Sequence, residues 1–307
     1  MRDGEVSVAA PGQSAPVLAD QPPGIAVLRV DGHEVAHYLW KPDLPLAMSP
    51  RPYLHPVRTL AGHTVTDASP DSHRHQFGIS IAAPDIDGRN FWGGRSFVAG
   101  HGPAWLDNHG MQRHQRWLRR TGTELIHVLR WIDARETTLL REQRSITCRR
   151  VDDTAWSLSV HTELANATER ALPFRSPASQ GRAGAGYGGF FWRGPALADA
   201  HRILSPAGTD AHSVNGTTAD WIAITCTDTD DSSWTVLFVP ADETTARDPW
   251  FVRARDYLGV GSSLTWDKPL VLEPGDAITR HIVTVVVDGA VSPARAAELA
   301  DTARSTA

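Results

Sequence analysis

Five histidines stand between Asp71 and His114, and no other stretch concentrates as many side chains able to transfer protons. Imidazole changes its charge near neutral pH, so it can act as a general acid or base, and neutral imidazole also binds metal ions. The segment therefore predicts a chemical site. The histidines are His73, His75, His101, His109 and His114.

The first two histidines are separated by one residue and precede a strand-like run from Phe77 to Ala83. Residues two apart on a strand point to the same face, so the imidazoles of His73 and His75 are expected to converge. We predict His73 to be catalytic. The same pair is the candidate for a divalent metal, with a third ligand from the remaining histidines of the segment.

Asp107, Asn108 and His109 form a second cluster, and His114 follows it. A carboxylate beside a histidine can fix its tautomer and raise its basicity. His109 is therefore the predicted partner of His73 in acid–base catalysis, and His114 is an alternate.

Glu142 and Arg144 are spaced by two within one strand-like run, so they share a face. Glu142 is a further catalytic alternate if that face lines a cleft. The other interpretation is a solvated cross-strand ion pair.

Aromatic and arginine side chains beside glycines or at strand starts form the predicted substrate-binding set. A tryptophan next to glycines can stack on a sugar ring, although such a residue can equally belong to the core. Arginine would hold hydroxyl or carboxylate groups. The glycine-dense run from Gly181 to Gly189 is followed by no lysine, so it predicts a mobile loop beside a pocket, not a phosphate-binding loop. The set is Asn90, Trp92, Arg144, Tyr187, Arg193, Trp250 and Arg253.

The run from Asp85 to Asn90 resembles the first half of a calcium loop, but its twelfth position is Ser96 instead of glutamate. We therefore expect a tight turn with Gly88 in a left-handed conformation.

Short alternating runs dominate the chain and predict strands. The first two join at an Asp31-Gly32 turn between Ile25 and Trp40. The others are expected at Phe77–Ala83, Gln112–Arg119, Glu124–Asp133, Thr138–Arg150, Ala155–Asn166, Gly188–Arg193, Trp221–Thr227, Trp234–Pro240, Phe251–Leu258 and Ala277–Asp288.

One segment reads clearly as a helix, with Ser292 as N-cap and Pro293 in the first turn. The pattern predicts an all-β fold, a large antiparallel β-sandwich with a short C-terminal helix. Residues 1–24 are expected to form a disordered tail, 25–289 a single sandwich domain, and 290–307 the C-terminal helix and tail.

Composition narrows the class of protein. The 307 residues carry a net charge of −5 without a basic run, which argues against nucleic acid as partner. No signal peptide and no membrane-length apolar run is seen, so we expect a cytoplasmic protein that does not bind membranes. Cys148 and Cys226 lie far apart within apolar runs and are expected to be buried free thiols.

Five blocks in order resemble a bacterial family known as PmoA-like, or methane oxygenase PmoA. Methane oxygenase subunits are membrane proteins, so the name looks like a misnomer for a chain without a span. The family resemblance implies a carbohydrate-related role and a β-sandwich similar to that of aldose epimerases (galactose-mutarotase-like). The blocks are Pro50–Gly62, Gly78–Gly94, Leu106–His114, Gly186–Pro195 and Pro249–Tyr257.

The chain departs from that family at one motif. Members commonly read D-H-P-x-H-H-G, whereas here only His73 and Gly78 keep the pattern and the paired histidines are replaced by Gln76 and Phe77. If that pair is catalytic in relatives, this chain lacks it, uses His75 instead, or performs different chemistry.

The predicted function is a carbohydrate-active enzyme that uses histidine acid–base chemistry on a sugar or keto-sugar, of epimerase, lyase or hydrolase type. No GxSxG, HExxH or dinucleotide fingerprint is present, so no organic cofactor is predicted. The expected partner is a small sugar-like substrate. The alternatives are a non-catalytic sugar-binding or regulatory protein and an enzyme with a histidine-ligated divalent metal.

Overall fold

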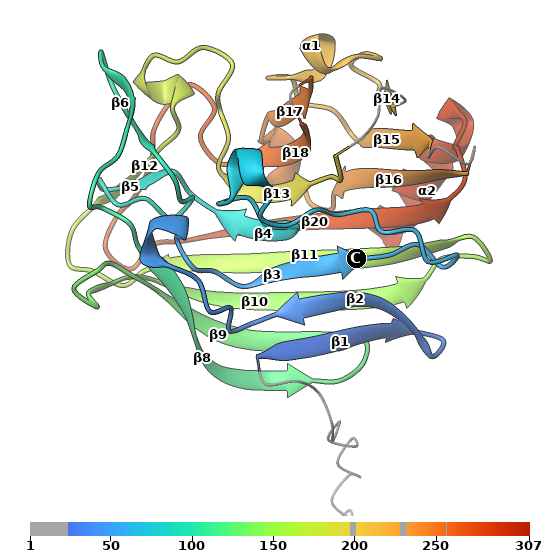
Figure 1. Ribbon diagram of the computed structural model, residues 1–307, viewed down its shortest axis with the longest axis horizontal. Helices are drawn as coiled ribbons and strands as arrows, with labels where there is room; N and C mark the ends of the chain where they lie inside the picture. Colours follow the sequence, from blue (N-terminus) through green and yellow to red (C-terminus); the bar gives the residue numbers. More distant parts are fainter. Residues whose placement is uncertain (1–23, 197–200, 228–231, 256) are drawn as a thin grey trace, which may run out of the picture.

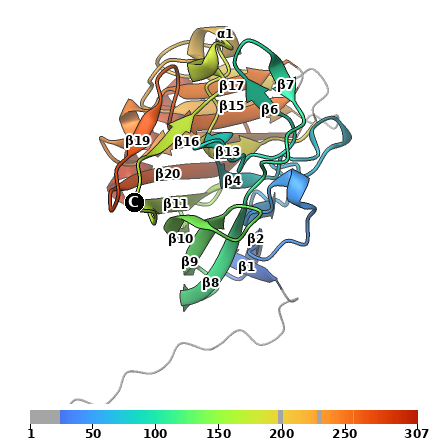
Figure 2. The same cartoon turned by 90° about the vertical axis from the view of Figure 1, so that its left-hand side faces the viewer.

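The computed structural model describes residues 24–196, 201–227, 232–255 and 257–307. The predicted N-terminal tail, residues 1–24, lies outside this part except for Gly24. Most of the regular secondary structure belongs to two large antiparallel sheets, which lie face to face in Figures 1 and 2. One apolar cluster, with Leu28 and Ile79 from one sheet and Leu140 and Trp156 from the other, fills the space between them.

The larger sheet has eight strands in the order β14-β15-β16-β20-β11-β10-β9-β8. Side chains alternate along β10, where Glu142 and Ile146 are buried against the other sheet while Arg141 and Gln143 are exposed. The strands are β8 (Met111–Arg120), β9 (Glu124–Ile132), β10 (Thr138–Arg150), β11 (Ala155–Asn166), β14 (His201–Leu204), β15 (Ile222–Thr227), β16 (Ser233–Pro240) and β20 (Ala277–Asp288).

The smaller main sheet has seven strands in the order β1-β2-β3-β4-β13-β18-β17. Gly78, just before β4, has φ +32°, and a Cβ there would lie 1.9 Å from the carbonyl oxygen of Leu54, so only glycine fits. The strands are β1 (Ile25–Val30), β2 (His33–Leu39), β3 (Tyr53–Val57), β4 (Ile79–Ala82), β13 (Gly189–Arg193), β17 (Trp250–Ala254) and β18 (Leu258–Ser263).

Two small sheets stand at one end of the sandwich, on the left in Figure 1. The first joins β19 (Leu270–Leu272), β12 (Leu172–Arg175) and β5 (Asp85–Ile86), and the second joins β6 (Ser96–Val98) to β7 (Gly102–Ala104). These short pieces frame the loops that carry the candidate site.

Helices are few. Helix α2 (Pro293–Ser305) begins at Ser292, whose hydroxyl accepts a hydrogen bond from the Arg295 amide at 3.2 Å. Its apolar side, including Leu299 and Ala303, packs on β16 and β20. Helix α1 (Ala211–Val214) and the short 3-10 turns η1 (Leu46–Met48), η2 (Asp71–His73), η3 (Ala178–Gln180) and η4 (Thr245–Arg247) complete the set. Within the described ranges, neither α-helix has the length and apolar character needed to cross a bilayer.

The predicted all-β antiparallel sandwich with a C-terminal helix is confirmed, and β10, β11 and β20 have the predicted bounds. Cys148 and Cys226 are both buried, as expected. The single strand predicted for Phe251–Leu258 is wrong, because β17 ends at Ala254 and the chain turns back into β18. The alternating pattern of that run does not distinguish a continuing strand from the end of one.

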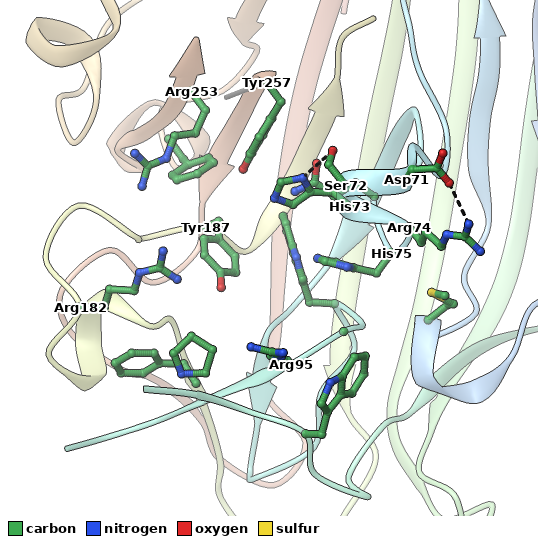
Figure 3. Close-up of a pocket in the computed structure, with 18 residues that line it drawn as sticks. Asp71, Ser72, His73, Arg74, His75, Arg95, Arg182, Tyr187, Arg253 and Tyr257 are labelled. Carbon is green, nitrogen blue, oxygen red and sulfur yellow. Dashed lines mark hydrogen bonds and ion pairs between the residues drawn. The ribbon is translucent and has the colours of Figure 1, made fainter. Parts of the chain in front are cut away.

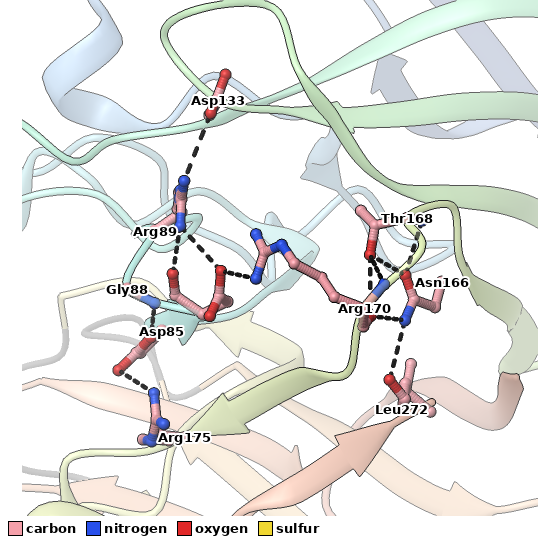
Figure 4. A network of polar contacts seen from close by, with 10 residues as sticks. Asp85, Gly88, Arg89, Asp133, Asn166, Thr168, Arg170, Arg175 and Leu272 are labelled. Carbon is pink, nitrogen blue, oxygen red and sulfur yellow. Dashed lines mark hydrogen bonds and ion pairs between the residues drawn. The ribbon is translucent and has the colours of Figure 1, made fainter. Parts of the chain in front are cut away.

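The predicted turn at Asp85–Asn90 is confirmed, with Gly88 at φ +81° and its amide donating to the Asp85 carboxylate at 2.7 Å. Figure 4 shows that arginines surround the acidic groups of this turn. Arg89 donates to the Asp87 carboxylate at 2.9 Å, and Arg170 pairs with the same carboxylate. These ion pairs occupy the oxygens that a calcium loop would aim at a cation.

Candidate functional site

A cavity of about 680 Å³ opens where several loops meet beside the smaller main sheet (Figure 3). Its walls combine imidazoles, arginines and aromatic rings, which come from segments far apart in the sequence. The lining residues are Met48, Asp71, Ser72, His73, Arg74, His75, Gln76, Trp92, Gly94, Arg95, Phe97, Pro103, Trp105, Arg182, Tyr187, Phe251, Arg253 and Tyr257.

His73 and His75 both face this cavity, with ring centroids 6.0 Å apart. The expected strand geometry is wrong, because Asp71–His73 form the 3-10 turn η2 and the chain continues as a turn through His75. Asp71 stands in the first turn of η2, where a negative charge is favourable, and this favours a helical turn over an extended run. His73 Nδ1 lies 3.1 Å from the Ser72 hydroxyl, and its ring contacts that of Tyr257 at 4.9 Å.

His75 is held neutral by its surroundings. Its pKa is lowered to about 4, chiefly by burial, with smaller contributions from the positive charge of Arg51 and from the nearby His73. At neutral pH this imidazole therefore offers one donor and one acceptor nitrogen to a ligand.

Arg51, which the sequence-based site did not include, fixes the backbone around the cavity. Its buried guanidinium donates to the carbonyl oxygens of His75 at 2.8 Å and Trp92 at 3.0 Å. Burial lowers the pKa of Arg51 to about 9, with a smaller contribution from Arg144, so the group stays charged at neutral pH. Its only signal in the sequence is its place in the block that begins at Pro50.

Trp92 lines the cavity, but most of its surface packs against Tyr187 and Phe191, with ring centroids 4.6 and 4.8 Å away. Asn90 lies behind it and positions the loop, because its Oδ1 accepts hydrogen bonds from the amides of Trp92 and Gly93, each at 2.8 Å. Tyr187 and Arg253 line the cavity as the sequence-based set proposed, whereas Asn90 does not.

His109 and Arg193 lie just outside the lining. His109 is buried, and its Nε2 lies 2.7 Å from the carbonyl oxygen of Gly94. Arg193 donates to Gln76 at 2.9 Å and stacks over Tyr257 at 4.5 Å. Both therefore support residues that face the cavity.

The remaining residues of the sequence-based set lie elsewhere. Glu142 and Arg144 form a buried ion pair between the two main sheets, with Nε and Oε1 2.7 Å apart. His114 contacts His127 at 3.0 Å between Nδ1 atoms. Trp250 is a core residue whose indole donates to the Ala219 carbonyl at 2.9 Å. None of the four lines the cavity.

A metal ion requires several side-chain ligands placed close together. Within the described ranges, no group of three or more histidine, cysteine, aspartate or glutamate side chains is placed to hold a metal ion. His73 and His75 supply two imidazoles, and the nearby carboxylate of Asp71 already pairs with Arg74 at 2.8 Å. Among the described residues, His73 and His75 thus have no third side-chain ligand of these types beside them.

Gly94 lies against the imidazole of His75, and a substitution at Gly94 tests this packing in the cavity wall. A Cβ on Gly94 would lie 2.7 Å from His75 Nδ1, and the residue has φ +68°. Gly94→Ala is expected to lower the free energy of unfolding by about 2 kcal/mol, from left-handed strain of about 1 kcal/mol plus displacement of the imidazole. Urea unfolding measures it.

Gly88→Ala is the matched control for this substitution. Gly88 has φ +81°, but nothing lies within 4 Å of a Cβ built there. Gly88→Ala should therefore lower the free energy of unfolding by about 1 kcal/mol, from backbone strain alone. Equal losses in the two variants would contradict the contact between Gly94 and His75.

Comparison with solved structures found likenesses of low identity. A putative aldose 1-epimerase from Escherichia coli K12 is 12% identical, with 86% of this chain and 99% of that chain covered and a TM-score of 0.47. A GalM/aldose epimerase homologue from C. elegans is 8% identical, with 87% and 99% covered and a TM-score of 0.39. A polysaccharide lyase is 11% identical over 88% of this chain but 33% of its own, with a TM-score of 0.34. At these scores the likenesses carry no argument about function.

Comparison with the curated proteins found no match. Residues 26–301 match the model of a family described as a family of unknown function, DUF6807. That match does not carry the PmoA-like name suggested by the sequence blocks. Because it spans nearly the whole chain, the protein belongs to the DUF6807 family of unknown function.

Proposed function

We propose that this protein is a carbohydrate-active enzyme that uses histidine acid–base chemistry on a sugar or keto-sugar. One observation carries the proposal: a cavity of about 680 Å³ brings aromatic faces and hydrogen-bonding cations together with two imidazoles. Cavities of roughly 300–1,000 Å³ suit small ligands. Aromatic faces suit the apolar faces of sugar rings, and arginines suit their oxygens.

Each wall has a distinct task in this proposal. Tyr187, packed on Trp92, offers a ring face and a hydroxyl, and Trp105 at the rim is 62% exposed and free to cover a ligand. His73 is the proposed acid–base residue, since it is half-buried and in contact with Tyr257. His75 stays neutral and binds a substrate oxygen or hydroxyl.

The chemistry would be a proton transfer next to a carbonyl or at the anomeric carbon. His73 would remove the proton from carbon or oxygen, and the imidazolium so formed would return it to the product or leaving group. Epimerisation and elimination begin with such a removal, and hydrolysis uses it to activate a water molecule, so the cavity walls alone do not select among the three.

Substitution of His73 tests the proposal. His73→Gln is expected to lower kcat on a turned-over sugar on the order of 100-fold, because it removes the proton-transferring group. His33→Gln is the matched control, since His33 is exposed on β2 and does not line the cavity. The substrate is found first by screening aldoses, keto-sugars and their acids. Unchanged turnover in the His73 variant would contradict the assigned role.

Non-catalytic sugar binding is the second candidate. Among the described lining residues the only carboxylate is Asp71, and it is paired with Arg74. The described walls therefore offer no unpaired carboxylate as a second acid–base group. Full ligand affinity in His73→Gln, without turnover of any sugar by the wild type, would favour this role.

A further inference from the structure

Arginines outnumber carboxylates in the cavity. Arg74, Arg95, Arg182 and Arg253 line it, whereas Asp71 is the only acidic residue among the described lining residues. Arg74 is paired with that carboxylate at 2.8 Å. Within the described part of the chain, no ion pair involves the other three, so positive charges outnumber negative ones among the described lining residues.

The arginines are gathered around one tyrosine. Figure 3 shows Arg182 and Arg95 on two sides of Tyr187, with Arg253 above it. Both Arg182 and Arg253 act electrostatically on the Tyr187 hydroxyl, although burial dominates and raises the pKa of Tyr187 to about 12. Arg253 also stacks over Phe251 at 5.5 Å, which limits the positions its guanidinium can take. Arg182 and Arg253 are thus both close enough to Tyr187 to act on it, and Arg95 lines the same cavity.

The hydroxyl of Tyr187 adds a neutral donor. It points into the cavity in Figure 3, and Tyr187 is one of the residues that line it. A half-buried hydroxyl beside cations is costly to leave unsatisfied, and an anionic oxygen would satisfy it. Guanidinium groups also bind carboxylate or phosphate through paired hydrogen bonds.

We propose that the ligand is an anionic sugar, whose carboxylate or phosphate group is held by Arg95, Arg182 and Arg253 with the Tyr187 hydroxyl. The proposal rests on the proposed function for the sugar part of the ligand. The anionic group is inferred from the arginines and the Tyr187 hydroxyl and does not depend on the sugar. The anionic group would anchor one end of the molecule and leave the sugar ring toward Trp92 and the two imidazoles.

Inorganic phosphate is the first probe, because it tests the anion site without any assumption about the sugar. In the wild type, phosphate at tenfold above its Kd should raise Tm by about 2 °C relative to chloride at equal ionic strength. The shift should be lost in the double variant Arg95→Gln/Arg182→Gln. It should remain in Arg141→Gln, whose arginine is exposed on β10 and lines no cavity described here.

A neighbouring cavity requires its own control. It is about 650 Å³ in volume and shares Arg253 with the first, while Arg202 lines only this second one. Arg202→Gln should leave the phosphate effect intact. Loss of the effect in Arg202→Gln, or its persistence in the double variant, would overturn the proposal, as would a wild type that does not respond to phosphate.

Neutral and charged forms of the same sugar then show whether the anionic group is a carboxylate or a phosphate. They also test whether the ligand is a sugar. Binding of glucose, glucuronate and glucose 6-phosphate, and of the galactose series, is measured by titration calorimetry. At least one acid or phosphate should bind about tenfold more tightly than its neutral parent, and the double variant should lose that gain. Equal affinity for neutral and charged sugars would overturn the anion inference and leave the proposed function standing. Phosphate binding as tight as that of every sugar phosphate would support the anion site and contradict the sugar.

Discussion

Glu142→Ala is expected to lower the free energy of unfolding by about 3–5 kcal/mol, because it leaves a buried arginine without its counter-charge. Arg144 donates to both carboxylate oxygens of Glu142, at 2.7 and 2.9 Å. Burial opposes the charge of Arg144, but the carboxylate outweighs it and raises the pKa of the arginine above its ordinary value. Trp131 and Thr162 donate to the same carboxylate, each at 2.7 Å, and would lose their acceptor too.

Glu163→Ala is the matched control for this prediction. Glu163 stands on the neighbouring strand β11 and is exposed, so its loss should change the free energy of unfolding by less than about 0.5 kcal/mol. Urea unfolding at pH 7 measures both variants. A loss of less than 1 kcal/mol in Glu142→Ala would contradict the structural role of the ion pair.

Glu142→Ala also tests whether Glu142 contributes to ligand binding or only to the stability of the fold. The sequence placed Glu142 among the catalytic alternates, yet the ion pair lies between the main sheets and not in the wall of the cavity. We therefore expect Glu142→Ala, when folded, to bind sugars with wild-type affinity at 15 °C. A folded variant that loses binding would return Glu142 to the site.

The alternation of side chains along a strand explains how much of the Glu142–Arg144 ion pair could be predicted from the sequence. A period of two correctly placed Glu142 and Arg144 on one face of β10, since both are buried there. The same period does not say whether that face meets a cleft, solvent or a second sheet, because the covering elements are distant in sequence. Tyr38 and Gln112, which complete the network around Arg144, come from β2 and β8.

The cavity was predictable only in part, for a similar reason. Local motifs identified His73, His75, Trp92, Tyr187 and Arg253, and all five line it. Arg95, Arg182 and Tyr257 were not singled out, because each becomes relevant only when separate loops converge.

Lowering the pH from 6.5 to 4 is expected to destabilise the protein, and His75 should account for up to about 3 kcal/mol of the loss. Its pKa in the folded protein is about 4, against an ordinary value of 6.5, because burial and the nearby charge of Arg51 disfavour the imidazolium. Between these two values the unfolded chain binds a proton that the folded protein does not. The stability is therefore complete above pH 6.5 and falls as the pH drops toward 4.

His75→Gln tests this share directly, because glutamine has no proton to bind in this range. The wild-type and variant unfolding free energies, measured in urea from pH 7 to 4.5, should converge as the pH falls. His55, His127 and His281 also have lowered pKa values, chiefly through burial, but their effects occur in both proteins and cancel in the difference. Parallel curves would mean that His75 accepts a proton in the folded state as readily as in the unfolded one. That result would contradict the neutral state of His75 in the cavity wall. It would also contradict the proposal that His75 binds the substrate while His73 transfers the proton.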